Sequence, residues 1–96
     1  MINAQEAKQN RANYEIGIHI AVSENVNELI NTMSASIEFH SKNGFDSLEF
    51  CPYDKSRFPS NQALKIAETI FAEILTSNGY EIIHNDAFNN SLKIRW

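Results

Sequence analysis

The feature that most constrains the fold is a pair of predicted strands, YEIIHN at residues 80–85 and SLKIRW at 91–96; in SLKIRW apolar and polar side chains alternate. This alternation is typical of half-buried β-strands. Only DAFNN separates the two segments, and so short a connection predicts an antiparallel hairpin. Because an isolated hairpin is at best marginally stable in water, the rest of the chain must supply another strand and a cover for the apolar face.

The cover is predicted from residues 61–77, which form the clearest amphipathic helix of the chain. Ser60 or Asn61 is placed to cap its start, and Asn78-Gly79 is a typical helix end. Its apolar side chains recur at helical spacing. They are Ala63, Leu64, Ala67, Ile70, Phe71, Ile74 and Leu75.

A third strand is predicted at SLEFC, residues 47–51, which also alternates. Strand periodicity then sorts the side chains of all three strands onto two faces. The face expected under the helix holds Leu48, Phe50, Tyr80, Ile82, Leu92, Ile94 and Trp96. The outer face holds Glu49, Cys51, Glu81, Ile83, Lys93 and Arg95. The same parity places His84 on the covered face, opposite Cys51, and predicts that Trp96 closes one end of the core.

The first half of the chain predicts a long helix. Asn3 and Glu6 have the spacing of a capping box, and the helix should end at Lys42-Asn43-Gly44. Residues 15–22 are ambiguous, since EIGIHIAV alternates like a strand and also fits a helical stripe. A continuous helix, a helix bent near 17–25 and a strand are the alternatives, and we favour helix across the region.

The predicted fold class is therefore α+β, with a long N-terminal helix followed by a β-α-β-β unit whose small antiparallel sheet is covered by one helix. Residues 1–96 suit a single domain. Within it we expect 1–43 to be a helical region for oligomerisation and 44–96 to form the β-α-β-β unit. Apolar residues on more than one side of the long helix predict a dimer or larger assembly through residues 16–40.

Composition and charge exclude several classes of function. The net charge is −4, which argues against general binding of nucleic acid, since that requires a basic surface. No apolar run approaches the roughly 20 residues of a membrane span, and the first residues lack the apolar core of a secretory signal. Cys51 is the single cysteine, so no disulfide forms within the chain, and we expect a cytoplasmic protein.

Several segments together resemble small bacteriophage accessory proteins. They are the NAQEA helix start, the long helical half ending at Lys42-Asn43-Gly44, the LTSNGYEI junction and the hairpin ending in SLKIRW. The resemblance spans most of the chain. It implies a long helix followed by an α+β half, and a protein that binds host factors or blunts host defence in the host cytoplasm. For some such proteins it implies the sequestration of nucleotide immune signals.

The residues offer little for catalysis or metal binding. His19, His40 and His84 stand far apart, and no CxxC or HxxxH spacing occurs. Cys51 and His84 are expected on opposite faces of the sheet, which argues against a nucleophilic pair. No phosphate-binding glycine loop or nucleophile elbow is present. We therefore predict no enzyme, no metal and no cofactor.

The most informative polar segment is the loop YDKSRFPSN, residues 53–61. It places two cations just before a helix N-terminus, which favours anions, and two aromatic rings that can stack on a base. The predicted ligand-binding residues are Tyr53, Lys55, Arg57, Phe58, Ser60, Asn61 and, from a neighbouring subunit, Arg95. In the simpler interpretation the loop is solvated, Phe58 packs in the core, and Arg95 pairs with a glutamate across the sheet.

Two functions remain open from the sequence. The first is a non-enzymatic oligomer that binds and sequesters an anionic small molecule, such as a nucleotide signal. The second is a binding module that inhibits a host defence protein or transcription factor through an acidic helical surface. That surface comprises Glu6, Glu15, Glu24 and Glu28.

Overall fold

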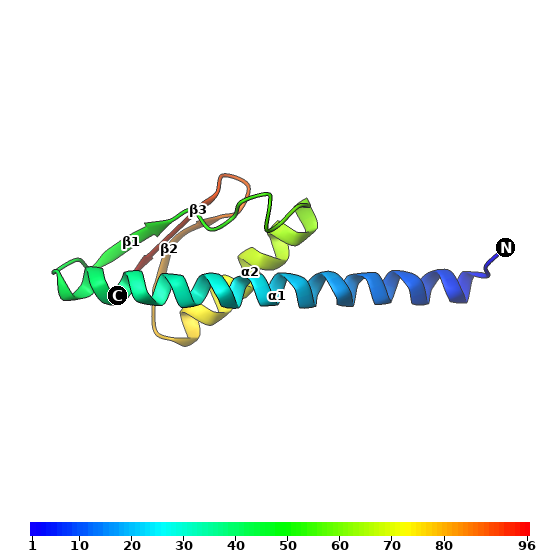
Figure 1. Ribbon diagram of the computed structural model, residues 1–96, viewed down its shortest axis with the longest axis horizontal. Coiled ribbons are helices and arrows are strands. Elements are labelled where there is room, and N and C mark those ends of the chain that lie inside the picture. Colours follow the sequence, from blue (N-terminus) through cyan, green and yellow to red (C-terminus); the bar gives the residue numbers. More distant parts are fainter.

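The computed structural model describes residues 1–96 and contains two helices and a three-stranded sheet (Figure 1). The elements follow in the order α1 (Ala4–Lys42), β1 (Ser47–Phe50), α2 (Asn61–Ser77), β2 (Glu81–Asp86) and β3 (Ser91–Arg95). This is the predicted α+β class with the predicted order of elements. Each helix and strand lies within a residue or two of its expected position.

Helix α1 runs without interruption for 39 residues. Asn3 caps it, because its side-chain oxygen accepts a hydrogen bond from the Glu6 backbone N–H at 2.9 Å. Residues 15–22, for which a strand was an alternative, are helical, and Figure 1 shows α1 as a continuous helix. The helical stripe prevails there because Ile18 and Val22 extend the apolar row that continues into the core.

Both helices end at a glycine with positive φ, as predicted. Gly44 has φ 89° and Gly79 has φ 87°, in the left-handed region that side chains with a Cβ rarely adopt. Beyond Gly79, the Tyr80 N–H donates to the Leu75 carbonyl at 3.1 Å, which satisfies a free carbonyl of the last turn. The glycines therefore turn the chain sharply from α1 into β1 and from α2 into β2.

The sheet has the strand order β1-β3-β2, and both pairings are antiparallel. Leu48 pairs with Ile94, and Phe50 with Leu92, so these four side chains share one face as predicted. The last strand thus lies in the centre of the sheet, hydrogen-bonded on both sides. This explains why Leu92 and Ile94 are completely buried.

A β-bulge between Ile82 and His84 changes the predicted parity of β2. Beyond it, His84 pairs with Lys93 and Asn85 pairs with Leu92. The extra residue moves His84 from the covered face, where it was expected, to the outer face. Asn85 takes the inner position, where its amide donates to the Glu68 carbonyl at 3.0 Å.

The two helices pack against the sheet and against each other. Helix α2 contacts β2, helix α1 contacts β1, and the helices also contact one another, so the cover is broader than the single helix predicted. The face of α1 that packs is formed by Val22, Val26, Met33 and Ile37. The second half of the region 1–43 therefore belongs to the core of the chain, and the role of this region in oligomerisation stays a prediction.

The molecule is elongated because half of α1 projects from it. Its extents are 63 × 23 × 19 Å and its radius of gyration is 16.3 Å, against about 12 to 13 Å for a compact domain of this length. Figure 1 shows the N-terminal part of α1 reaching beyond every other element. In residues 4–21 no side chain is buried, and only Ile18 is partly covered. We call residues 4–21 the projecting half of α1 and residues 22–42 its packed half.

Trp96 lies at the rim of the core and not inside it, which corrects the prediction that it closes the core. Its exposure is 37%, and its ring meets Tyr80 edge-on at 6.3 Å. The indole N–H donates to the Phe45 carbonyl at 3.0 Å, and the Trp96 backbone N–H donates to the Asp46 carbonyl at 3.0 Å. These two hydrogen bonds of Trp96 connect the end of the sheet to the turn that follows α1.

Candidate functional site

The loop between β1 and α2 is a compact turn organised by Asp54. One carboxylate oxygen of Asp54 accepts hydrogen bonds from the backbone N–H groups of Ser56 and Arg57, both at 3.0 Å, and from the Ser56 hydroxyl. The Ser56 hydroxyl is the main reason that the pKa of Asp54 lies below its usual value. The Phe58 N–H donates to the Asp54 carbonyl at 3.0 Å. The sequence DKSR therefore has a defined shape before any ligand is present.

The two aromatic residues of this loop point into the core. Tyr53 is 2% exposed and Phe58 is 0% exposed, and the Tyr53 ring meets Phe71 edge-on at 5.4 Å. The Tyr53 hydroxyl donates to the side-chain oxygen of Asn85. This corrects the expectation that the two rings flank a ligand. The simpler interpretation, in which Phe58 packs in the core, is correct, and Tyr53 is buried there as well.

The polar residues of the predicted site lie at the surface. Arg57 forms an ion pair with Asp54, with 3.4 Å between Nε and the carboxylate oxygen, and its terminal nitrogens have no partner in the chain. Lys55 is exposed without an ion pair. The Ser60 hydroxyl accepts from the Ala63 N–H at 3.1 Å, which makes Ser60 the N-cap of α2. Asn61 is the exposed first residue of that helix.

Arg95 lies at the other end of the sheet from this loop. It pairs with Ser47, the first residue of β1, whereas the loop follows Phe50, the last residue of β1. Its guanidinium donates through Nε to Glu81 at 3.0 Å, with a second contact from a terminal nitrogen. Within one chain Arg95 is therefore separate from Arg57 and pairs across the sheet, as the simpler interpretation described.

A groove between α1 and the loop brings part of the predicted site together with residues that sequence reasoning missed. It has a volume of about 290 Å³. Arg57 and Ser60 line one wall. The other residues lining it are Tyr14, Ile18, Ala21, Val22, Asn25, Pro59 and Ala63. Asn25 joins the two walls, since its amide donates to the Arg57 carbonyl at 3.1 Å.

The missed residues carry a weak signal in the sequence. Tyr14, Ile18 and Val22 are four positions apart, the spacing of neighbours on one side of a helix. That spacing predicts a shared face but does not show which loop lies against it. Which residues line the groove together depends on the contact between Asn25 and Arg57, which are 32 positions apart. We call this cavity the α1–loop groove.

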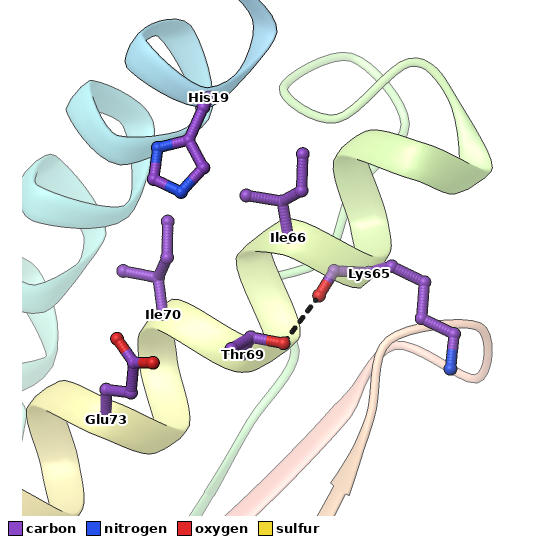
Figure 2. Close-up of a pocket in the computed structure, with 6 residues that line it drawn as sticks. All are labelled: His19, Lys65, Ile66, Thr69, Ile70 and Glu73. Atoms are coloured by element: carbon purple, nitrogen blue, oxygen red, sulfur yellow. Dashed lines mark hydrogen bonds between the residues drawn. The ribbon is translucent and has the colours of Figure 1, made fainter. Parts of the chain in front are cut away.

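A second groove lies where α1 passes over α2 (Figure 2), with a volume of about 280 Å³. Ile66 and Ile70 point from α2 toward α1, and His19 points down from α1 toward them. Thr69 and Glu73 line the groove further along α2, while Lys65 turns away from it. The Lys65 ammonium lies 5.7 Å from the centre of the Phe88 ring instead. Ile66 and Ile70 form the apolar part of this groove, and its other lining residues are polar.

The acidic residues of α1 do not form one continuous face. Glu15 and Glu24 are nine positions apart, about two and a half helical turns, and therefore lie on opposite sides. Glu15 forms an ion pair with Arg11 at 3.2 Å. Glu24 and Glu28 are one turn apart on the same side, exposed, and have no ion pair in the chain. The predicted acidic surface is thus reduced to Glu24, Glu28 and, nearer the N-terminus, Glu6.

No group of three or more His, Cys, Asp or Glu side chains is arranged so that it would hold a metal ion. Neither helix carries an apolar stretch that could cross a bilayer, despite the length of α1. No protein-family model matches the chain, and searches among curated proteins and among solved structures find no similar protein. The geometry of the chain itself is therefore the basis for assigning a function.

Proposed function

We propose that this is a non-enzymatic binding protein that sequesters an anionic small molecule in the α1–loop groove. The observation that carries the proposal is the convergence of a guanidinium, Arg57, and an aromatic ring, Tyr14, on one apolar cavity. The ligand class is a molecule with a ring or apolar body and a negative group, of which a nucleotide is the example we favour. The resemblance to phage accessory proteins is in keeping with a role in lowering a nucleotide signal in the host cytoplasm.

The charge at the groove supports an anion. The contact between Arg57 and Asp54 uses Nε, so the two terminal nitrogens are free to form a bidentate pair with a phosphate or carboxylate. Ser60 marks the N-terminus of α2, where free backbone N–H groups and the helix dipole add positive potential. An anion bound here would interact with both features at once.

The rest of the groove supports an apolar or aromatic body. Ile18, Val22 and Ala63 provide an apolar floor, and the ring of Tyr14 is exposed at the wall. Stacking of a base on an aromatic side chain contributes about 1 to 3 kcal/mol. In this proposal Tyr14 takes the stacking role that the sequence suggested for Tyr53 and Phe58. The volume of about 290 Å³ suits a ligand the size of a single nucleotide, at the lower limit of ordinary ligand pockets.

The proposal is tested by calorimetric titration with three probes: AMP, adenosine and inorganic phosphate. AMP should bind most tightly, because it alone offers both the ring and the anion. Arg57→Ala should weaken AMP binding about 10- to 100-fold, the value of a charge-assisted hydrogen bond. Lys55→Ala is the matched control. It removes the same charge two positions away but does not line the groove, so we expect a change of at most about twofold.

Two results would refute the ligand site. Wild-type protein that binds none of the three probes, nor other mononucleotides, would remove the basis for the proposed function. Equal affinities in the Arg57→Ala and Lys55→Ala variants would place any anion site outside this groove. Native mass spectrometry of protein purified from signal-producing cells then identifies the natural ligand, since a tightly held nucleotide is retained.

A second candidate function is inhibition of a host protein through α1. It is favoured by Glu24 and Glu28, two exposed carboxylates without an ion pair on a part of the helix that no other element covers. A basic partner surface would be complementary to them. Capture of a host protein by wild-type chain, lost in a Glu24→Lys, Glu28→Lys variant, would support this function. Capture that is unchanged by the charge reversal would exclude this surface.

A further inference from the structure

The α1–loop groove has one wall that is fixed to the body of the molecule. Arg57, Ser60 and Ala63 contribute to this wall. Ala63 is buried, and the Ser60 hydroxyl caps α2. Asp54 fixes the loop by accepting hydrogen bonds from the backbone N–H groups of Ser56 and Arg57. A ligand therefore meets a preformed surface on this side of the groove.

The opposite wall is formed by α1 and crosses the boundary between the two halves of that helix. Val22 and Asn25 come from the packed half. Tyr14, Ile18 and Ala21 come from the projecting half. Tyr14 and Asn25 are eleven positions apart, so this wall extends about 16 Å along the helix. A ligand that reaches Tyr14 thus contacts a part of α1 that buries no side chain.

Few contacts within the chain hold the projecting half against the rest of the molecule. The side-chain hydrogen bonds and the ion pair of residues 4–21 stay within α1 and its cap. His19 points toward α2 (Figure 2), but its side-chain hydrogen-bond partner is Ser23 of the same helix. Ile18 is only partly buried. Helix segments with so few tertiary contacts open readily.

Gly17 weakens the projecting half further at its centre. It is the only glycine within a helix, since Gly44 and Gly79 lie beyond the helix ends and have positive φ. Relative to alanine, a glycine inside a helix shifts the equilibrium toward the open chain by a factor of about five. A Cβ at Gly17 would meet no atom within 4 Å. Packing therefore does not require a glycine at this position.

We propose that ligand binding in the α1–loop groove orders residues 14–21 of α1, and that Gly17 keeps this segment open before binding. This inference rests on the proposed function. A ligand that contacts both Arg57 and Tyr14 joins the projecting half to the body. Since both contacts require residues 14–21 to be helical, binding stabilises the helical state. Release then requires the segment to open first, which suits a protein that retains its ligand.

The coupling predicts that helix stability changes affinity at a position that the ligand does not touch. The apparent dissociation constant equals the intrinsic one divided by the fraction of molecules in the binding-competent state. Gly17 does not line the groove. A substitution at Gly17 therefore acts on that fraction through the helix alone.

Calorimetric titration with AMP measures this coupling. Gly17→Ala should tighten AMP binding by about two- to fivefold. Gly17→Pro should weaken it at least about tenfold, because proline interrupts the helix beside Tyr14. Asn27→Ala is the matched control. It also raises helix propensity at an exposed position, but it lies in the packed half, which the core already holds as a helix, so the affinity for AMP should stay the same.

Two further measurements locate the effect. Amide hydrogen exchange of the wild-type protein should show that AMP increases protection in residues 14–21. In Gly17→Ala these residues should be better protected before AMP is added. The fluorescence of Trp96, the single tryptophan, checks during urea unfolding that the Gly17 variants leave the body of the molecule folded.

The failure of this inference differs from the failure of the proposed function. The inference is overturned if AMP binds but residues 14–21 are equally protected with and without it. It is also overturned if Gly17→Ala and Asn27→Ala have the same affinity for AMP. In both cases the proposed function stands as long as Arg57→Ala weakens AMP binding. If neither AMP nor another mononucleotide binds, or if Arg57→Ala has no effect, the proposed function and this inference are both refuted.

Discussion

The two halves of α1 belong to one helix but differ in what stabilises them. The packed half contributes Val22, Val26, Met33 and Ile37 to the core, and its helical state is secured by tertiary packing. The projecting half buries no side chain. It depends on its Asn3 cap, on the Arg11–Glu15 ion pair and on intrinsic helix propensity. Such local terms contribute a few tenths to about 1 kcal/mol each, so this half is the less stable part of the helix.

The difference shows that helix formation and burial are separate properties of a sequence. A short helix segment without tertiary contacts is marginal in water, and α1 nevertheless continues well beyond the body of the molecule (Figure 1). The projecting half also exposes two isoleucines, Ile16 and Ile20. Tertiary packing within the chain explains the packed half, whereas the proposed function gives the projecting half a role through Tyr14 and Ile18, which line the α1–loop groove.

The largest expected effect is a difference in the free energy of unfolding between two charged substitutions, one in each half of α1. Val26 is completely buried, and Val26→Asp would place an unpaired carboxylate in the core at a cost of several kcal/mol. We expect this variant to be largely unfolded. Ile16→Asp, in the projecting half, should change the free energy of unfolding by no more than about 0.5 kcal/mol under monomeric conditions. Urea unfolding followed by circular dichroism at 222 nm measures both.

Similar changes in the free energy of unfolding for the two substitutions would contradict the division of α1 into a packed and a projecting half. If Ile16→Asp also unfolds the protein, the projecting half is part of the cooperative core. If Val26→Asp is tolerated, the packing of α1 against α2 contributes less than its burial indicates.

A smaller effect is expected at the far end of the packed half, where Trp96 is fastened to Phe45 and Asp46. A fully buried aromatic side chain replaced by alanine usually costs about 3 to 5 kcal/mol. Since Trp96 is 37% exposed, we expect about 2 kcal/mol for Trp96→Ala. Urea unfolding followed by circular dichroism gives the value. An indole that is freely quenched by iodide in the wild-type protein would instead indicate that the ring does not pack against Tyr80.

The elements with strong local signals were predicted correctly from the sequence. The spacing of Ala63, Ala67 and Phe71 identified α2, and Gly44 and Gly79 identified the helix ends. These signals succeed because periodicity and positive φ depend on a few neighbouring residues.

The features that were predicted wrongly or missed depend on contacts between residues that are distant in sequence. A bulge beside His84 reverses the parity of half a strand without altering the local pattern. Tyr53 and Phe58 lie in a polar loop, and only the positions of Phe71 and Asn85 determine that they turn inward. The α1–loop groove was missed for the same reason, since Tyr14 and Arg57 are brought together by tertiary structure alone.

The burial of the Tyr53 hydroxyl in the core can be tested through the pH dependence of stability. Burial is the main cause that raises the pKa of its hydroxyl above the usual value near 10, with a further contribution from Glu68. Because the folded state favours the neutral hydroxyl, this contribution to stability is complete below pH 10 and decreases as the pH rises above it. Tyr53→Phe should cost about 1 to 2 kcal/mol at neutral pH, since it leaves the Asn85 oxygen without its donor.

The difference between wild type and Tyr53→Phe should therefore shrink above pH 10, because the variant has no hydroxyl to ionise at this position. Tyr14→Phe is the matched control, as Tyr14 is exposed on the projecting half. Urea unfolding at neutral and alkaline pH measures the change. A constant difference across this range would mean that the Tyr53 hydroxyl is not buried.

The smallest effect is expected at the boundary between the two halves. The Asn25 amide, which donates to the Arg57 carbonyl at 3.1 Å, is the first side-chain hydrogen bond that ties α1 to the body. Asn25→Ala should lower the free energy of unfolding by about 1 kcal/mol or less, the usual value of a neutral hydrogen bond near the surface. Its clearer consequence is local, because the start of the packed half loses a fixed contact.

Amide hydrogen exchange measures that boundary along α1. In the wild-type monomer, protection should be weak from residue 4 to about residue 21 and rise where Val22 enters the core, since local opening governs exchange in segments with few buried contacts. Asn25→Ala should move this rise toward Val26. Strong protection that begins near residue 4 in dilute protein would contradict the division of α1. Protection that extends to the N-terminus only at high concentration would identify the projecting half as the segment ordered by association.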